Sequence, residues 1–84
     1  FVLIAQIRKS AISIPSNIAE GCGRGTDKQL IHFLDIAIGS NCELETQIYL
    51  SFDLEYISQE EQDRFVSEIT EIRRMILKFR DKWS

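Results

Sequence analysis

Few side chains in this sequence are of the types that carry out chemistry. Cys22 and Cys42 are its only cysteines, and His32 is its only histidine. Two thiols are too few for a structural zinc site, which takes four ligands, or for a disulfide-stapled domain. Neither cysteine has a base nearby in the sequence that would make it reactive. We therefore predict reduced thiols, no metal site and no organic cofactor.

The carboxylates and glycines offer no better candidate for catalysis. Glu43 and Glu45 lie two residues apart on a predicted helix, so they point to different faces and cannot pair in one site. Gly21, Gly23 and Gly25 precede a predicted helix start, but no strand leads into them and no lysine is placed for a phosphate. Because no nucleophile, base and orienting group converge, we predict no catalytic residue and expect a protein that is not an enzyme.

The length of 84 residues allows one domain, residues 1–84, with a core that is only marginally stable without a partner. The chain starts at Phe1 inside an apolar run, so we expect a further N-terminal portion. This run has neither the basic residues nor the cleavage site of a signal peptide. No stretch reaches the roughly 18 apolar residues of a membrane span. We expect a cytoplasmic protein with no membrane partner.

The net charge of −3 is unevenly distributed. Acidic residues outnumber basic ones between residues 26 and 57, whereas both ends of the chain hold basic residues in clusters. Because neutralisation of phosphates dominates nucleic-acid binding, only these ends could contribute such a contact. The candidates for nucleic-acid contact are Arg8, Lys9, Arg24, Arg73, Arg74, Lys78, Arg80 and Lys82.

Apolar residues recur at helical spacing and predict an all-α protein with helices at about residues 1–20, 27–54 and 59–82. Pro15 lies inside the first apolar stripe and predicts a kink or a break into two helices, with Ser13 and Ser16 placed to cap the freed groups. The glycines within residues 20–25 predict a turn that can adopt positive φ at little cost.

Local signals mark where the second and third helices begin. Thr26 with Gln29, and Ser58 with Glu61, each have the spacing of a capping box, in which two side chains satisfy each other's backbone amide. The connections between helices are short, which favours antiparallel packing of neighbours.

Three residues of the later helices carry specific expectations. Gly39 predicts close approach by another helix, because a glycine inside a helix is unfavourable unless packing offsets it. Asn41, polar on an apolar stripe, is typical of a residue that fixes register. Glu68 is placed on the exposed charged face of the third helix. The predicted buried stripes are Ile4, Ile7, Ala11, Ile14 and Ile18; Leu30, Phe33, Leu34, Ala37, Ile38, Asn41, Leu44, Ile48 and Phe52; and Phe65, Ile69, Ile72, Ile76, Phe79 and Trp83.

The segment of residues 13–21, which reads SIPSNIAEG, is followed by Gly23 and Arg24. This segment resembles the bacterial four-helix-bundle proteins called 23S rRNA intervening sequence proteins. The resemblance covers essentially the whole chain. Further matching residues are Gln6, Ile7, Arg8, Phe33, Leu34, Ile36, Ala37, Gly39, Ser40, Glu43, Leu44, Glu45, Tyr56, Ile57 and Ser58.

The resemblance implies an up-down four-helix bundle, of which this chain holds three helices and lacks the family's first. It also implies a ring-shaped homopentamer whose biochemical role is largely undefined. A related branch, the accessory proteins of diversity-generating retroelements, is pentameric and basic and binds a reverse transcriptase and nucleic acid. This chain departs from that branch in being acidic. It also has Glu55 where the family often places a glycine, which predicts a strained or differently shaped turn.

Surplus apolar residues on the first two helices predict self-association. Ala5, Ile12 and Ala19 form a second stripe on the first helix, and Ile31 and Ile36 lie outside the main stripe of the second. One bundle core can bury only one such stripe, whereas a closed ring can bury the other on every subunit. We also expect a hydrogen-bonded polar corner. The predicted interface and corner residues are Arg8, Ile12, Asn17, Glu20, Arg24, Ile36 and Glu43.

We therefore expect a non-enzymatic homo-oligomeric scaffold, a pentamer by resemblance, that presents a surface to a protein or RNA partner. The alternative is a nucleic-acid-binding accessory factor that acts with a reverse transcriptase or ribosomal RNA.

Overall fold

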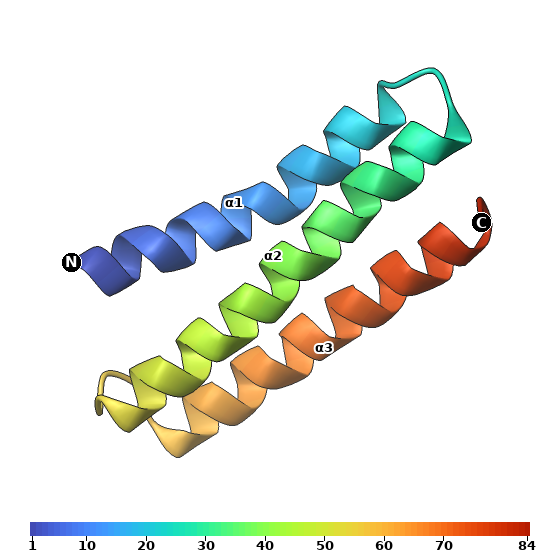
Figure 1. Ribbon diagram of the computed structural model, residues 1–84. Helices are drawn as coiled ribbons and strands as arrows, with labels where there is room; N and C mark the ends of the chain where they lie inside the picture. Colours follow the sequence, from blue (N-terminus) through green and yellow to red (C-terminus); the bar gives the residue numbers. More distant parts are fainter.

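The computed structural model describes residues 1–84 and consists of three α-helices without strands (Figure 1). Helix α1 comprises Val2–Cys22, α2 comprises Asp27–Asp53, and α3 comprises Gln59–Asp81. Successive helices run antiparallel (Figure 1). The all-helical class and the three predicted helical segments are confirmed.

Side-chain caps fix the starts of α2 and α3. In the complete capping box at α3, the Glu61 amide donates to Ser58 Oγ (3.1 Å) and the Ser58 amide donates to Glu61 Oε1 (2.9 Å). At α2 the Gln29 amide donates to Thr26 Oγ1 (3.2 Å), but Gln29 Oε1 accepts from the Thr26 hydroxyl rather than from its amide. The predicted box is therefore confirmed at α3 and only half formed at α2.

Helix α1 runs through Pro15 without a break, so the alternative of two separate helices is wrong. Its ribbon changes direction in the middle, and the N-terminal half diverges from α2 (Figure 1). A proline inside a helix causes such a bend because it removes a backbone donor and crowds the preceding turn. Ser13 Oγ is not used as a cap here, because it bonds to Ser40 Oγ across the α1–α2 contact (2.7 Å).

The three helices form an open layer with α2 in the middle (Figure 1). Both α1 and α3 pack against α2, but no Cα atom of α1 lies within 8 Å of a Cα atom of α3. The molecule extends 44 × 23 × 12 Å, which is a flat slab rather than a closed bundle. One side of α2 is therefore left without a helix between α1 and α3.

The buried core is small for the number of apolar residues in the chain. It centres on α2, where Leu34 and Ala37 are fully buried, with Ile14 of α1 and Ile76 of α3 packed on either side. Much of the predicted stripes is not buried: Ile4, Ala11 and Ile72 are exposed. The predicted spacing is correct, but the structure provides no partner helix for these residues.

The only positive φ of the chain occurs in the α2–α3 turn, which contains no glycine. The turn between α1 and α2 is confirmed, but none of its glycines adopts a positive φ; the positive φ belongs to Glu55, at 64°. Gly21 is instead required by space, because a Cβ atom there would lie 2.9 Å from Phe33 Cβ. A Cβ atom at Gly39 would have nothing within 4 Å, so close approach of another helix of this chain is wrong. The expected strain at Glu55 is confirmed, since this region of φ favours glycine.

Candidate interaction surfaces

An apolar groove runs along the side of the layer that lacks a helix. Its middle is a hollow of about 400 Å³ between α1 and α3, with α2 as its floor. Shared residues join this hollow to neighbouring hollows at both ends, so the three form one continuous surface. We call it the front groove. Its lining residues include Ile4, Ile7, Ala11, Ile18, Leu44, Ile48, Ile57, Phe65, Ile69, Ile72, Met75 and Phe79.

Polar side chains in the front groove are few. Ser51 is buried and donates its hydroxyl to the Gln47 carbonyl (2.8 Å), so it is satisfied within α2. Glu68 lines the same hollow as Ile72 and Phe65, so it does not belong to the charged outer face of α3, where the sequence places it. The groove is thus an apolar surface with one carboxylate at its wall.

A polar seam joins α1 to α2 through uncharged donors. Ser10 donates to Glu43 Oε1 (3.2 Å), and the Gln47 side chain donates to the same oxygen (3.2 Å). Farther along, Asn17 Nδ2 donates to the Ser13 carbonyl (2.8 Å) within α1. Gln47 Oε1 is buried without a hydrogen-bond partner. No ion pair joins α1 to α2.

The predicted polar corner does not form as one network. Glu20 pairs with Arg24 (2.8 Å), and the Arg24 guanidinium also lies over the Phe33 ring, 5.0 Å from its centroid. Asn17 bonds only to Ser13, and Glu43 belongs to the polar seam with Ser10 and Gln47. Arg8 has no ion-pair partner. The corner is therefore a local contact at the α1–α2 turn.

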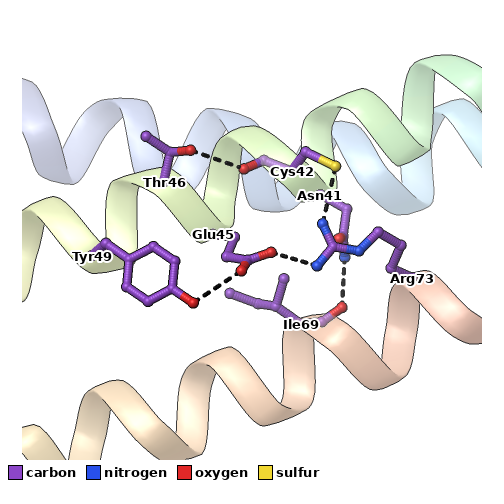
Figure 2. A network of polar contacts seen from close by, with 7 residues as sticks. All are labelled: Asn41, Cys42, Glu45, Thr46, Tyr49, Ile69 and Arg73. Carbon is purple, nitrogen blue, oxygen red and sulfur yellow. Dashed lines mark hydrogen bonds and ion pairs between the residues drawn. The ribbon is translucent and has the colours of Figure 1, made fainter.

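Charged groups join α2 to α3 (Figure 2). Arg73 of α3 donates to both Cys42 Sγ (3.0 Å) and Glu45 Oε1, and Tyr49 donates its hydroxyl to the other oxygen of Glu45 (3.0 Å). The hydrogen bond from Arg73 is the main reason that the pKa of Glu45 lies below its ordinary value. The hydrogen bond to the same carboxylate raises the pKa of the Tyr49 hydroxyl.

Two further contacts complete the α2–α3 interface. Arg80 Nε donates to Asp35 Oδ1 (2.6 Å). Asn41 is fully buried, and its amide donates to the Ile69 carbonyl (3.0 Å), as Figure 2 shows, while its own oxygen has no partner. Asn41 was predicted from the sequence as a polar residue in the core, but the ion pairs of Arg73 and Arg80 were not predicted. The one available signal was the spacing of Arg73 and Arg80, seven residues apart on one helix face.

The candidate nucleic-acid contacts divide into two groups. Arg24, Arg73, Arg74 and Arg80 are each paired with a carboxylate of this chain, which reduces their availability to phosphates. The candidates without such a pair are Arg8, Lys9, Lys78 and Lys82. Because α1 and α3 do not meet, these four residues lie on two separate helices and form no single patch.

The remaining chemistry-bearing residues are dispersed. Cys22 and Cys42 are free, exposed thiols, and the His32 ring packs edge-on against Phe33. No group of three or more His, Cys, Asp or Glu side chains is placed to hold a metal ion. None of the helices is both long enough and apolar enough to cross a membrane.

The fold and its surfaces together define an all-helical protein with one apolar side left open. The chain belongs to the family of 23S rRNA-intervening sequence proteins, whose model matches residues 1–78. The family expected from the sequence is thereby confirmed.

A solved structure agrees with this assignment. It is a crystal structure of a protein with unknown function from the S23 ribosomal protein family of Bacteroides thetaiotaomicron VPI-5482. It is 30% identical to this chain and superposes with a TM-score of 0.93, covering 96% of this chain and 72% of the solved one. No curated protein matches the sequence.

Proposed function

We propose that this protein is a non-enzymatic scaffold in which a fourth helix covers the front groove and completes a four-helix bundle. The protein also associates with further copies of itself. The observation that carries the proposal is the continuous apolar groove, because a surface of this kind in water marks an interaction site or an aggregation hazard. An antiparallel helix laid between α1 and α3 would bury it. The proposed assembly is a homopentamer held by α1 and α2.

The length of the solved relative supports the fourth helix. This chain covers only 72% of that structure, so more than a quarter of the relative has no counterpart here. A helix in the groove would also bury the exposed residues of each apolar stripe. This explains why the helical spacing of apolar residues continues through positions that are exposed in this chain. A catalytic function has no support, because no group of residues is placed to transfer a proton or to bind a substrate.

The second candidate function is a nucleic-acid-binding accessory factor acting with a reverse transcriptase or ribosomal RNA. Arg8 and Lys9 on α1 favour it, since neither is paired with a carboxylate. The intrachain pairing of four other candidates and the net charge of −3 weigh against it. Sedimentation with and without RNA separates the two: a scaffold sediments as a homo-oligomer alone, and an accessory factor shifts to a faster-sedimenting complex with RNA.

A charge placed in the groove tests whether a helix covers it. Ile72 is 41% exposed in this chain and lies in the groove, whereas Leu77 is 43% exposed on the same helix and is not among the groove's lining residues. If a helix covers the groove, Ile72→Lys destabilises the protein by at least about 2 kcal/mol, because it buries an unpaired charge. Leu77→Lys is the matched control and costs less than about 0.5 kcal/mol. Equal, small losses in urea unfolding would mean that the groove is open to water.

A further inference from the structure

Helices α1 and α2 each carry a row of side chains that are exposed along its whole length. The α1 outer row has successive spacings of three and four residues, and so does the α2 outer row, which is the pattern of a helix-packing stripe. The α1 outer row is Ala5, Arg8, Ile12, Pro15 and Ala19, and the α2 outer row is His32, Ile36, Gly39, Glu43, Thr46 and Leu50. Every one of these residues is exposed.

The corresponding row of α3 shows what a solvated helix face looks like in this protein. It consists of Glu60, Asp63, Ser67, Glu71, Arg74, Lys78 and Asp81, all exposed and none apolar. By contrast, Ile12 is 64% exposed on α1, and Ile36 and Leu50 are exposed on α2. The outer rows of α1 and α2 thus resemble packing surfaces, whereas the α3 row does not.

Each of the two outer rows contains one charged residue that no opposite charge of this chain neutralises. Arg8 has no acidic partner, and its row is otherwise apolar. Glu43 accepts only from the uncharged donors Ser10 and Gln47, and both bonds go to Oε1, so its second oxygen is free. The two rows are therefore complementary in charge, and both also expose apolar side chains.

The two rows also match in height along the helices. Ser10 bonds to Glu43 and Ser13 bonds to Ser40, so these pairs mark equal heights on α1 and α2. Ile12 accordingly lies between the heights of Ser40 and Glu43, and Arg8 lies within one turn of Glu43. A second copy placed beside the first, with its helices parallel to the same axis, presents its α2 outer row to α1 at these heights. Gly39 leaves open space there, because a Cβ atom at this residue would have nothing within 4 Å.

We infer that the α1 outer row of one copy docks antiparallel on the α2 outer row of a second copy, with Arg8 paired to Glu43 of the partner subunit. This inference rests on the self-association proposed above and specifies the surfaces and the ion pair that make it. The contact is heterologous, since it joins different surfaces of the two copies, and its repetition by rotation generates a ring. Ile12 enters the space above Gly39, which accounts for a glycine at an exposed helical position where alanine is otherwise favoured.

Charge exchange tests the pairing. Arg8→Glu and Glu43→Arg should each weaken association at least about tenfold, because each places like charges opposite one another. The double variant restores the pair in reversed orientation and should assemble like the wild type. An equal mixture of the two single variants should associate more strongly than either variant alone, since each supplies the charge that the other lacks. A five-membered ring still keeps at least one like-charged contact, so the mixture should recover only part of the wild-type association. Sedimentation velocity at micromolar concentration measures all four samples, with circular dichroism to check helicity.

The control is Lys78→Glu, which reverses an unpaired exposed charge in the α3 outer row and should leave association unchanged. If the wild type assembles but the single variants do too, or if neither the double variant nor the mixture is restored, the Arg8–Glu43 pairing is wrong while self-association stands. If the wild type is a monomer, the pairing and the proposed self-association both fail.

Discussion

Helix α2 meets its two neighbours in different ways. Toward α1 the contact is close and contains no ion pair: it is formed by Gly21, which leaves no room for a side chain, and by serine hydroxyls such as Ser13 and Ser40. Toward α3 the contact is held by charged groups, Arg73 with Glu45 and Arg80 with Asp35. The first contact should therefore be more sensitive to volume and the second more sensitive to pH, because steric fit does not titrate and the carboxylate of an ion pair does.

The largest expected effect concerns volume at the α1–α2 contact. Gly21→Ala places a Cβ atom 2.9 Å from Phe33 Cβ and 3.3 Å from the Leu30 carbonyl oxygen, so the helix ends must separate. Overpacking costs about 1–3 kcal/mol and the gain in helix propensity returns up to about 1 kcal/mol, for a net loss of about 1–2 kcal/mol. Urea unfolding measures it. Gly25→Ala is the control, with open space around its Cβ position, and a loss there equal to that at Gly21 would contradict the steric explanation.

The next effect concerns the turns that lead into the two contacts. The α1–α2 turn contains glycines but no positive φ, whereas the α2–α3 turn has a φ of 64° at Glu55. Glu55→Gly should stabilise the protein by about 0.5–1 kcal/mol, because glycine adopts this conformation without the cost that a Cβ atom imposes. Thermal unfolding would detect the gain. Glu55→Ala keeps a Cβ atom and should give none, so equal stabilisation by both would point to the lost charge instead.

The smallest effect is the acid sensitivity of the α2–α3 contact. The pKa of Glu45 is lowered in the folded protein, so its carboxylate stabilises the fold above about pH 4.5 and loses this effect as the pH falls through the lowered pKa. Arg73 and Glu45 are both about one-fifth exposed, so we expect less than about 1 kcal/mol from the pair. Glu45→Gln should flatten the decline in stability below about pH 4.5 by this amount.

Hydrogen exchange can show which helix loses stability in acid. Amides of α3 should lose protection in acid before those at the buried α1–α2 contact, where no ion pair is present. The carboxylate of Glu61 also has a lowered pKa, because it accepts from the Ser58 amide, and its protonation frays the start of α3 in the same range of pH. Uniform loss of protection across the chain would contradict a difference between the two contacts.

Much of the fold follows from local sequence patterns. The stripe through Ile69 and Ile76 predicts α3, and Ser58 with Glu61 predicts where it begins, because these contacts join residues three to seven positions apart. Thr26 shows the limit of such reasoning, since the same spacing gives only half of a capping box. Which rotamer Gln29 adopts depends on competing donors that the spacing does not specify.

The candidate surfaces follow less directly. Arg8, Ile12, Ile36 and Glu43 were expected at an interface or at a polar corner, but their arrangement as two exposed rows of matching height depends on how α1 pairs with α2. The expected corner network fails for the same reason, because Asn17 and Glu43 find nearer partners.

The sequence by itself determined the helices, their approximate ends and the family. The helices and their ends depend on residues close together in the chain, and the family depends on which residues occupy which positions. The tertiary structure decided which apolar stripes are buried. Ile14 and Ile72 occupy equivalent stripe positions on their helices, yet Ile14 is buried and Ile72 is exposed. The physical reason is that periodicity specifies the face of a helix that avoids water, whereas burial requires a second element to cover that face. In this chain α2 covers Ile14, and no helix covers the front groove.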